Sequence, residues 1–501
     1  MRAVAVLLAI VVPALAAAVA AGQAGAPDGL VVQVSTEPPG LDLTATPASA
    51  TAAIVHYNVQ ETLVKVDRTG RLVPGLAERW HTADSRNYTF FLKRGVRFHN
   101  GRPFTAADVK FAIERAMDPA TKHPHRNHYD AVGDIIVADD HTVTFSLKSA
   151  NANFLLTLAR QGSVIYPREA VDSLKSNPVG TGPFKMGEWA RGDRITLVRN
   201  PHYHVKGLPR LGRVTFRFIP DPNAALAAVK AGDVDASLFG LGPEHVQDLR
   251  GDARFQVIVG DTTNDVVMAM NNARKPFTDV RVRRAITHAV NKPEIVKGAM
   301  FGMGRILGSN VDPLNPYFVD VSGVVPHDPA RARALLAEAG YPKGFDAVLK
   351  VAPQYYYTVR TGEIVVDQLK KVGVNVRIEQ VEWGQWLARV YCRPPCTEPD
   401  YDLTIIGHAE AWDIGNYANP RYYFRYDSPR FQALFRQSEV TLDDRARRDL
   451  YARMQRVLAE EAPVVFLYVH PRLAAARKGV QGLWKDLPAL AADLSEVAVT
   501  P

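Results

Sequence analysis

Histidines are the side chains whose spacing in this sequence most readily suggests chemistry. His123, His125 and His128 fall within six residues, and His202 and His204 could add two further imidazoles. Neutral imidazole is a common ligand of transition metals. Zinc and related sites usually show fixed ligand spacing, however, and the loop-like segments around these histidines lack it. We therefore expect surface histidines and no resident metal or cofactor, with metal binding by this cluster as the open alternative.

The local motifs of the commonest enzymes are absent from the sequence. It contains no G-x-S-x-G elbow, no H-E-x-x-H and no phosphate loop, which are signatures of many hydrolases, metalloenzymes and nucleotide-binding proteins. Gly180 and Gly182 flank a threonine, but Pro183 lacks the backbone donor that a phosphate cradle would use. We expect no catalytic residues and no enzyme activity. A triad assembled from distant Ser, His and Asp residues is the alternative that motifs do not address.

The two cysteines, Cys392 and Cys396, form the phrase C-R-P-P-C. Three residues separate them, whereas the usual redox and zinc motifs have two. In an oxidising compartment we expect a disulfide that closes this small loop. In the cytosol, metal or redox chemistry would be the alternative.

Alternating apolar residues near the start of the chain predict strands. Tyr88, Phe90 and Leu92 occupy every second position, as the buried face of a strand requires. A second hairpin is predicted over 134–148, with its turn at Asp139-Asp140. Together these segments predict a small strand-rich subdomain.

Helix signals alternate with strand signals through the rest of the chain, which is typical of an α/β protein. Asp or Thr side chains can accept hydrogen bonds from the first backbone donors of a helix, and Pro fits the first helical position. The predicted caps are Thr105, Asp221, Thr278 and Asp328, and a further helix is expected over 362–371.

Bulk properties indicate an exported protein of more than one lobe. The chain has 501 residues, which exceeds one typical core. Arg2 precedes an apolar, alanine-rich run over 3–21, which predicts a cleaved secretory signal peptide over 1–24, with an uncleaved anchor as the alternative. No cysteine near this run offers a lipid-attachment site, which favours a periplasmic location. The net charge of +8 is modest, and no basic segment is interleaved with aromatic residues, so no nucleic-acid partner is expected.

Several phrases then indicate a family. L-x-P-x-L-A-x-x-W lies at 72–80, G-V-x-F-H-N-G-x-P-F-T-A-x-D-V at 95–109 and V-G-T-G-P-F-K-M-G-E-W at 179–189. With the helix-forming phrase that begins F-T-D-V-R at 277, they resemble the bacterial extracellular solute-binding proteins of family 5. Each phrase alone is weak, but together they span nearly the whole chain after the signal segment.

The resemblance implies a two-lobed α/β periplasmic binding protein, type II and cluster C-like, with an extra strand-rich subdomain in lobe one. Lobe one is expected over 27–264 and 472–501, including a subdomain over about 58–178, and lobe two over 265–471. Such a protein would be a monomer that closes on a peptide or peptide-like solute and delivers it to the permease of an ABC importer in the inner membrane. A metal chelate, haem, an amino-sugar or an aromatic compound is the alternative solute, and a secreted hydrolase is a further alternative.

The resemblance also places candidate ligand-binding residues. Glu37 and Tyr57 lie where family members face the cleft in lobe one. In lobe two, Asp413 or Glu410 could pair with a cationic group of the solute. Further candidates there are aromatic side chains that could wall an apolar pocket, namely Tyr355, Trp383, Trp386, Trp412 and Tyr417. For Trp383 and Trp386, core packing is an equally open interpretation.

Two departures from peptide-binding relatives bear on the solute. The Y-P-D-P phrase of those relatives is missing from 407–424. Dipeptide-binding relatives grip the solute carboxylate with an arginine before the next helix, whereas the segment 353–360 offers three tyrosines and only Arg360. These departures disfavour zwitterionic dipeptides and favour stacking and hydroxyl contacts with an aromatic, amino-sugar or modified-peptide solute.

Overall fold

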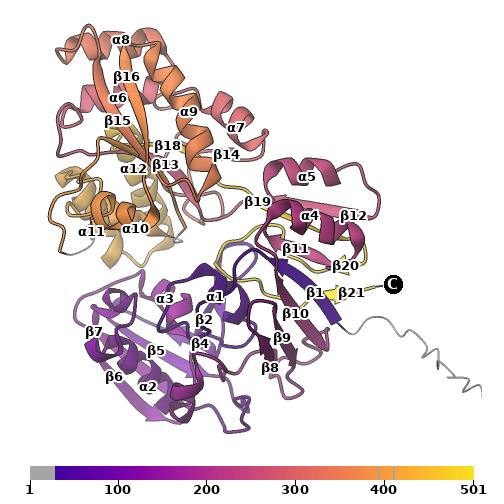
Figure 1. Ribbon diagram of the computed structural model, residues 1–501. Helices are drawn as coiled ribbons and strands as arrows, with labels where there is room; N and C mark the ends of the chain where they lie inside the picture. The colour runs from indigo at the N-terminus through magenta and orange to yellow at the C-terminus, as the bar shows by residue number, and fades with distance from the viewer. Residues whose placement is uncertain (1–28, 393–394, 410–411, 501) are drawn as a thin grey trace, which may run out of the picture.

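The computed structural model describes residues 29–392, 395–409 and 412–500. The predicted signal peptide and the candidate Glu410 lie outside the described residues. Within those residues, no helix is both long and apolar enough to span a bilayer. The chain forms two lobes, and a smaller strand-rich body belongs to the first of them (Figure 1).

Lobe one is built on a seven-stranded mixed sheet. The strand that comes first in sequence, β1 (Gly29–Val34), is parallel to both of its neighbours, and every other neighbouring pair in the sheet is antiparallel. In order across the sheet the strands are β12 (Phe255–Gly260), β19 (Arg472–Arg477), β11 (Ala236–Phe239), β1 (Gly29–Val34), β10 (Arg213–Phe218), β9 (Arg194–Arg199) and β8 (Phe184–Ala190). The sheet is therefore completed by a strand from near the end of the chain.

The strand-rich subdomain is a four-stranded antiparallel sheet covered by one helix. Its strands, in order, are β4 (Ala77–His81), β5 (Asn87–Leu92), β7 (Thr142–Leu147) and β6 (Val132–Asp139). The predicted hairpin is confirmed, with its turn one residue later than predicted, at Asp140-His141, because Asp139 still pairs with Thr142. Tyr88, Phe90 and Leu92 are buried, as their alternation predicted. They belong to the same hydrophobic cluster as Leu30 of β1, so the subdomain shares a continuous core with the large sheet.

Lobe two is built on a six-stranded mixed sheet. Across it the strands are β14 (Arg305–Ile306), β18 (Val464–Val469), β13 (Asp265–Met270), β17 (Leu403–His408), β15 (Phe345–Val351) and β16 (Val374–Gln380). All six residues of β13 are buried, because helices and loops cover both faces of the sheet. Two short pairs, β2 (Val64–Val66) with β3 (Leu72–Pro74) and β20 (Val480–Gln481) with β21 (Ala498–Val499), complete the described strands.

The helices divide between the lobes. Those of lobe one are α1 (Ser49–Val55), α2 (Ala106–Met117), α3 (Phe154–Thr157), α4 (Pro222–Ala231) and α5 (Pro243–Leu249). Those of lobe two are α6 (Val280–Ala289), α7 (Lys292–Met300), α8 (Pro329–Glu338), α9 (Tyr356–Lys370), α10 (Trp383–Gln385), α11 (Pro429–Val440) and α12 (Asp444–Glu461). Short 3-10 turns include η2 (Arg126–Tyr129), η3 (Gln161–Ser163) and η6 (Asp413–Ala418), and η5 (Trp386–Val390) is a π-helical turn.

Most predicted helix caps are confirmed, and one is wrong. Thr105 forms a capping box with Asp108, and the side chains of Asp221 and Asp328 accept hydrogen bonds at the starts of α4 and α8. The predicted cap Thr278 is replaced by Asp279, whose carboxylate accepts from the backbone nitrogen of Arg281. A carboxylate is the stronger acceptor at the positive end of a helix, so the start moves by one residue.

The chain crosses between the two large sheets at 261–264 and at 470–471. At lobe two these crossings are adjacent, because Asp265 and Val469 are partners in neighbouring strands. We propose the lobe boundaries at these crossings, with lobe one as 27–264 plus 472–501 and lobe two as 265–471. Two short segments that connect two rigid sheets side by side form a natural hinge.

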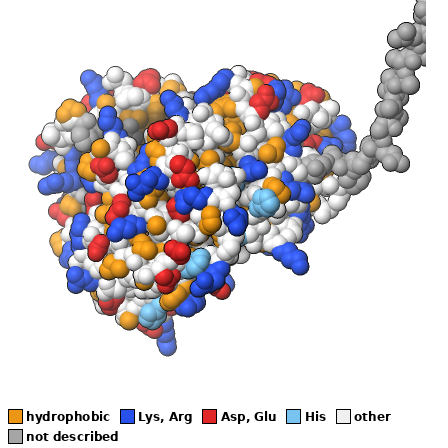
Figure 2. All heavy atoms as spheres, turned by 90° about the horizontal axis from the view of Figure 1, so that it is seen from below, with side chains coloured by type: hydrophobic (Ala, Val, Ile, Leu, Met, Phe, Trp, Pro, Cys, Tyr) orange, Lys and Arg blue, Asp and Glu red, His pale blue; other side chains and the backbone are white. Residues whose placement is uncertain are grey.

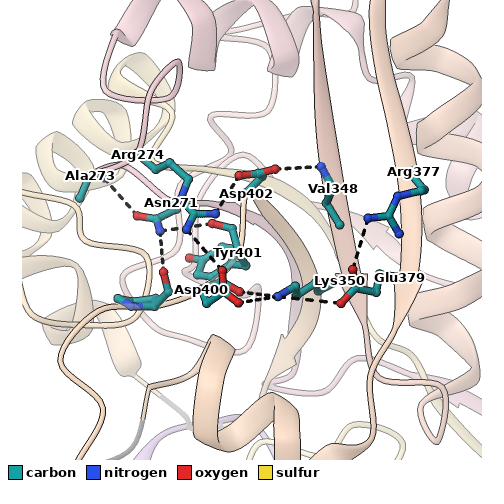
Figure 3. A network of polar contacts seen from close by, with 11 residues as sticks. Asn271, Ala273, Arg274, Val348, Lys350, Arg377, Glu379, Asp400, Tyr401 and Asp402 are labelled. Carbon is teal, nitrogen blue, oxygen red and sulfur yellow. Dashed lines mark hydrogen bonds and ion pairs between the residues drawn. The ribbon is translucent and has the colours of Figure 1, made fainter.

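A fully paired polar network ties β13, β15 and β17 together at the end of the sheet distant from the crossings (Figure 3). Arg274 donates to Asp402 at 3.1 Å, and Lys350 lies 3.0 Å from Asp400. The second oxygen of Asp402 accepts from the backbone nitrogen of Val348 at 2.9 Å. Each carboxylate of this network therefore has a cationic partner.

The surface carries both signs of charge. On the face shown in Figure 2, lysine and arginine side chains are interspersed with acidic ones. This face has no continuous basic stripe of the kind that binds a nucleic-acid backbone.

Candidate functional site

A cavity of about 350 Å³ lies where both lobes meet the crossings. Lobe one contributes residues at 34–39 and 48–53, and the crossings contribute 262–264 and His470. Lobe two contributes Ala409, immediately after β17. Ligands of two-lobed proteins bind between the lobes, so this is the candidate solute site.

A second cavity of about 80 Å³ adjoins the first and extends it into the strand-rich subdomain. Both are lined by Thr263, Ala409 and Leu490, and the second also by His56 and Arg160. Across both cavities, the described lining residues include one arginine and four histidines but no carboxylate, the histidines being His56, His125, His128 and His470.

Burial keeps three of the lining histidines neutral. It lowers the pKa of His56 to about 3, with the Lys65 cation adding to the effect, and the pKa of His470 to about 4. Burial and the neighbouring Arg160 lower the pKa of His128 to about 2. A neutral imidazole offers one donor and one acceptor. Neither ring nitrogen of His56 has a hydrogen-bond partner among the described residues, so the imidazole beside the second cavity is unsatisfied.

Arg160 is held at the cavity wall by the turn that follows α3. It directly precedes η3, and its Nη1 lies 3.0 Å from Nε2 of His128. The rings of His125 and His128 stack with centroids 5.0 Å apart. The expectation of surface histidines is wrong for His123, which is buried with Nε2 3.2 Å from the carbonyl of Gly162.

The candidates of lobe one make contacts inside the protein. Glu37 accepts hydrogen bonds from Trp189 Nε1 at 2.9 Å and from the Gly192 nitrogen at 3.1 Å, which ties the β1 end to β8. Tyr57 is buried, and its hydroxyl accepts from the Val66 nitrogen at 2.9 Å. Neither stands among the described lining residues of the two cavities. Their binding roles stay predictions.

The aromatic candidates of lobe two form part of its core. Trp383 and Trp386 stack with centroids 4.9 Å apart, and Tyr355 meets Trp383 edge-on at 5.3 Å. Trp386 is buried and donates from Nε1 to Thr404 Oγ1 at 3.0 Å. Tyr417 is fully buried. All four side chains pack in this core, where the Tyr417 hydroxyl has no hydrogen-bond partner among the described residues, and a contact with solute stays a prediction for each.

The segment after β17 carries the remaining candidates. Trp412 has a left-handed backbone (φ +62°), and its ring meets Tyr317 edge-on at 5.6 Å. Asp413 is 6% exposed, and its Oδ1 accepts from Asn310 Nδ2 at 2.7 Å. His408 Nδ1 lies 3.5 Å from Asp413 Oδ2. Asp413 therefore belongs to a buried polar cluster, which sequence reasoning did not find.

The lobes touch beside the cavities. Arg447 and Tyr451 of α12 both donate to Asn153 Oδ1, at 2.7 and 3.2 Å, and the Ala152 nitrogen donates to the carbonyl of Glu439 at 2.6 Å. A second contact joins α9 to α5, where Arg360 lies 3.1 Å from Glu244. The arginine nearest the tyrosine triplet is thus engaged with lobe one.

The cysteines lie between η5 and β17. The structure joins Cys392 and Cys396 by a disulfide with Cα atoms 5.0 Å apart. The bond closes the small loop that their spacing suggested.

Comparisons with known proteins agree with this architecture. The family model "Bacterial extracellular solute-binding proteins, family 5 Middle" matches residues 71–427. The glutathione-binding protein GsiB of Salmonella choleraesuis is 27% identical over 492 residues, which cover 94% of each protein. Among solved structures, the binding protein AgaA of A. tumefaciens R10 in complex with agropinic acid is 27% identical, with a TM-score of 0.79 over 94% of this chain and 99% of that one.

A second solved structure supports the fold. The periplasmic binding protein DppA of Helicobacter pylori is 24% identical, with a TM-score of 0.76 over 94% of this chain and 98% of that one. The matched family model covers well over half of the chain and includes strands of both large sheets. The chain is therefore a member of the bacterial extracellular solute-binding proteins, family 5.

Proposed function

We propose that this protein captures a peptide-like solute with at least one carboxylate between its lobes and delivers it to the permease of an ABC importer. The observation that carries the proposal is the lining of the two cavities, where the guanidinium of Arg160 stands beside neutral histidines and threonine hydroxyls. Of the two relatives at 27% identity, one is named as a glutathione-binding protein and the other was solved in complex with agropinic acid. Both compounds are carboxylic acids.

The physical basis is a charge-assisted contact formed in the closed protein. A guanidinium can hold a carboxylate with two parallel hydrogen bonds. Neutral histidines and hydroxyls, such as those of Thr262 and Thr263, can orient the amide and hydroxyl groups of the solute. A solute that touches both lobes binds the closed state better and shifts the equilibrium between open and closed forms toward it. No step of this cycle requires chemistry on the solute.

Isothermal titration of glutathione into the purified protein tests the role of Arg160. Losing one charge-assisted contact costs about 1.5–3 kcal/mol, so Arg160→Gln should weaken binding at least about tenfold. Arg126→Gln is the matched control, because Arg126 lies in the same subdomain, is exposed and stands outside the described lining. Equal affinities of the wild type and Arg160→Gln for an acidic solute would remove Arg160 from the site.

Native mass spectrometry of protein purified from its own host tests the solute class. A co-purified carboxylic acid of peptide-like composition supports the proposal. A co-purified cation without a carboxylate contradicts it. A sugar acid without an amide would instead favour the second candidate, a binder of non-peptide acids, which the likeness to AgaA motivates.

Export to the periplasm completes the proposal. The alanine-rich start of the sequence and the family membership support it. Fractionation of host cells should place the protein in the periplasm, with a mature chain that begins between residues 22 and 25. A full-length chain in the membrane fraction would favour the uncleaved anchor.

A further inference from the structure

Three buried side chains with metal-ligand chemistry converge at the end of β13 and β17 nearest the crossings. Asp265 begins β13 and His408 ends β17, and the two residues are direct cross-strand partners. Asp413 returns to them from the start of η6. Asp265 is 1% exposed, Asp413 6% and His408 9%. The strand register therefore places one imidazole and two carboxylates together inside lobe two.

The distances between them are too long for hydrogen bonds and short enough for a shared ion. His408 Nδ1 lies 3.5 Å from Asp413 Oδ2 and 3.8 Å from Asp265 Oδ2, and the three ligand atoms all lie within 4.8 Å of one another. Hydrogen bonds end near 3.2 Å. Within the described part of the chain, none of these three atoms has a hydrogen-bond partner.

Charge at this end of the sheet contrasts with the network at the other end. There, lysine or arginine pairs with Asp400 and Asp402. Among the described residues, no lysine or arginine forms an ion pair with Asp265 or Asp413. Two carboxylates buried together without a cation are strongly unfavourable, because neither their desolvation nor their repulsion is offset.

The outer contacts orient the three ligands as metal sites usually require. Tyr423 hydroxyl lies 2.9 Å from His408 Nε2. If Nε2 carries the proton and donates to this hydroxyl, the Nδ1 lone pair faces the two aspartates. Asn310 Nδ2 donates to the other oxygen of Asp413 at 2.7 Å. Such contacts fix the rotamers of ligating groups before the ion arrives.

We propose that Asp265, His408 and Asp413 form a buried site for one divalent transition-metal ion, with Zn²⁺ the best match to one imidazole and two carboxylates. Zinc bonds to nitrogen and oxygen are about 2.0–2.2 Å long, so tetrahedral ligands stand roughly 3.4 Å apart. The distances from His408 Nδ1 need only a few tenths of an ångström of contraction to meet this. A double positive charge also offsets both carboxylates.

The site differs in place from the solute cavities. Neither Asp265 nor His408 nor Asp413 lines them, whereas the next residue after His408, Ala409, lines both. An ion bound here would fix the start of the segment that walls the cleft. The inference stands independently of the proposed solute.

Titration of chelator-treated protein with ZnCl₂, in the absence of any solute, tests the proposal. We expect one ion per chain. Cobalt(II) should give a visible absorption spectrum of low-coordinate nitrogen and oxygen ligation, displaced by one equivalent of zinc. Burial and the Asp413 charge raise the pKa of Asp265. Binding should therefore release protons, which titrations in buffers of different ionisation enthalpy can count.

Variants separate this site from the other histidines. His408→Gln and Asp413→Asn should each weaken zinc binding by at least tenfold. His128→Gln, in the cluster of 123–128, is the matched control and should retain wild-type affinity. Circular dichroism checks that each variant is folded, and zinc should raise the melting temperature of the wild type but not of His408→Gln. The proposal is overturned if folded wild type binds no zinc, or if binding survives in His408→Gln and is lost in His128→Gln.

Discussion

Asn153 joins the two lobes through a single side-chain oxygen, and its removal should weaken solute capture. Arg447 and Tyr451 of α12 both donate to this oxygen, at 2.7 and 3.2 Å. Arg447 is 9% exposed, so solvent screens its contact little. A hydrogen bond to a charged group contributes about 1.5–3 kcal/mol and one between neutral groups about 0.5–1.5 kcal/mol. The backbone contact of Ala152 remains in Asn153→Ala, so we take about 2 kcal/mol as the loss.

A loss of 2 kcal/mol from the closed state alone shifts the balance between open and closed forms by a factor of about 30. Asn153→Ala should therefore weaken solute affinity by about 30-fold if the open form dominates without solute. If the closed form dominates, the affinity changes less and the radius of gyration of the solute-free protein rises instead. Calorimetry and small-angle X-ray scattering on the same samples measure both quantities.

Two further variants calibrate the result. Asn87→Ala removes an exposed side chain of the same subdomain, whose one hydrogen bond within the described residues is to Asp84, and should change neither quantity. Glu244→Gln breaks the contact with Arg360, but both side chains are about 40% exposed, so the effect should stay below about 1 kcal/mol. Unchanged affinity and unchanged scattering for Asn153→Ala would refute the closing role of this contact.

Three more perturbations have defined outcomes. Burial lowers the pKa of His470 from the ordinary 6.5 to about 4, so between these pH values the unfolded chain binds a proton that the folded chain does not, and the free energy of unfolding falls by about 2 kcal/mol from pH 7 to pH 5. In urea unfolding, the free energy of His470→Gln should fall by about 2 kcal/mol less over the same interval; an equal fall would contradict the burial argument. Trp386→Ala should lower the free energy of unfolding by about 3–5 kcal/mol. This loss should exceed that of Trp383→Ala, because Trp386 is buried and Trp383 only partly so. A larger loss for Trp383→Ala in urea unfolding would make Trp383 the core anchor. Replacing Cys392 and Cys396 by serine should lower the melting temperature through a loss of about 2 kcal/mol, since the closed loop is short, and an unchanged melting curve would show that the loop is ordered without the bond.

Local signals in the sequence predicted much of the fold. Tyr88, Phe90 and Leu92 alternate because one face of β5 packs into the core of lobe one and the other face is exposed or half-buried, so their pattern shows the strand directly. Asp221 and Asp328 were found as caps because their carboxylates and the following prolines act within one helical turn. Such features need no knowledge of distant segments.

The start of α9 shows where local signals fail. The sequence predicted a helix over 362–371, yet α9 begins at Tyr356. Three consecutive tyrosines have poor helix propensity. Tyr357 is nevertheless buried in the core of lobe two, and this packing outweighs the propensity.

The site was harder to predict because its residues come together only in three dimensions. His56, Arg160, Thr263 and Ala409 line adjoining cavities from four distant segments, and no local spacing connects them. Asp265 and His408 are neighbours only through the pairing of β13 with β17. A single sequence gives no register between strands that lie more than a hundred residues apart.

The position of β19 sets an order on the folding of this chain. β19 lies between β12 and β11 in the lobe one sheet and pairs with both, yet it follows the whole of lobe two in sequence. During synthesis, β12 must therefore wait for residues 472–477 before it can join its sheet. Lobe two, whose strands all lie within 265–469, can complete its own sheet before that moment. We expect a chain truncated after lobe two to leave β12 as an unpaired strand, and therefore to be a substrate for chaperones and proteases.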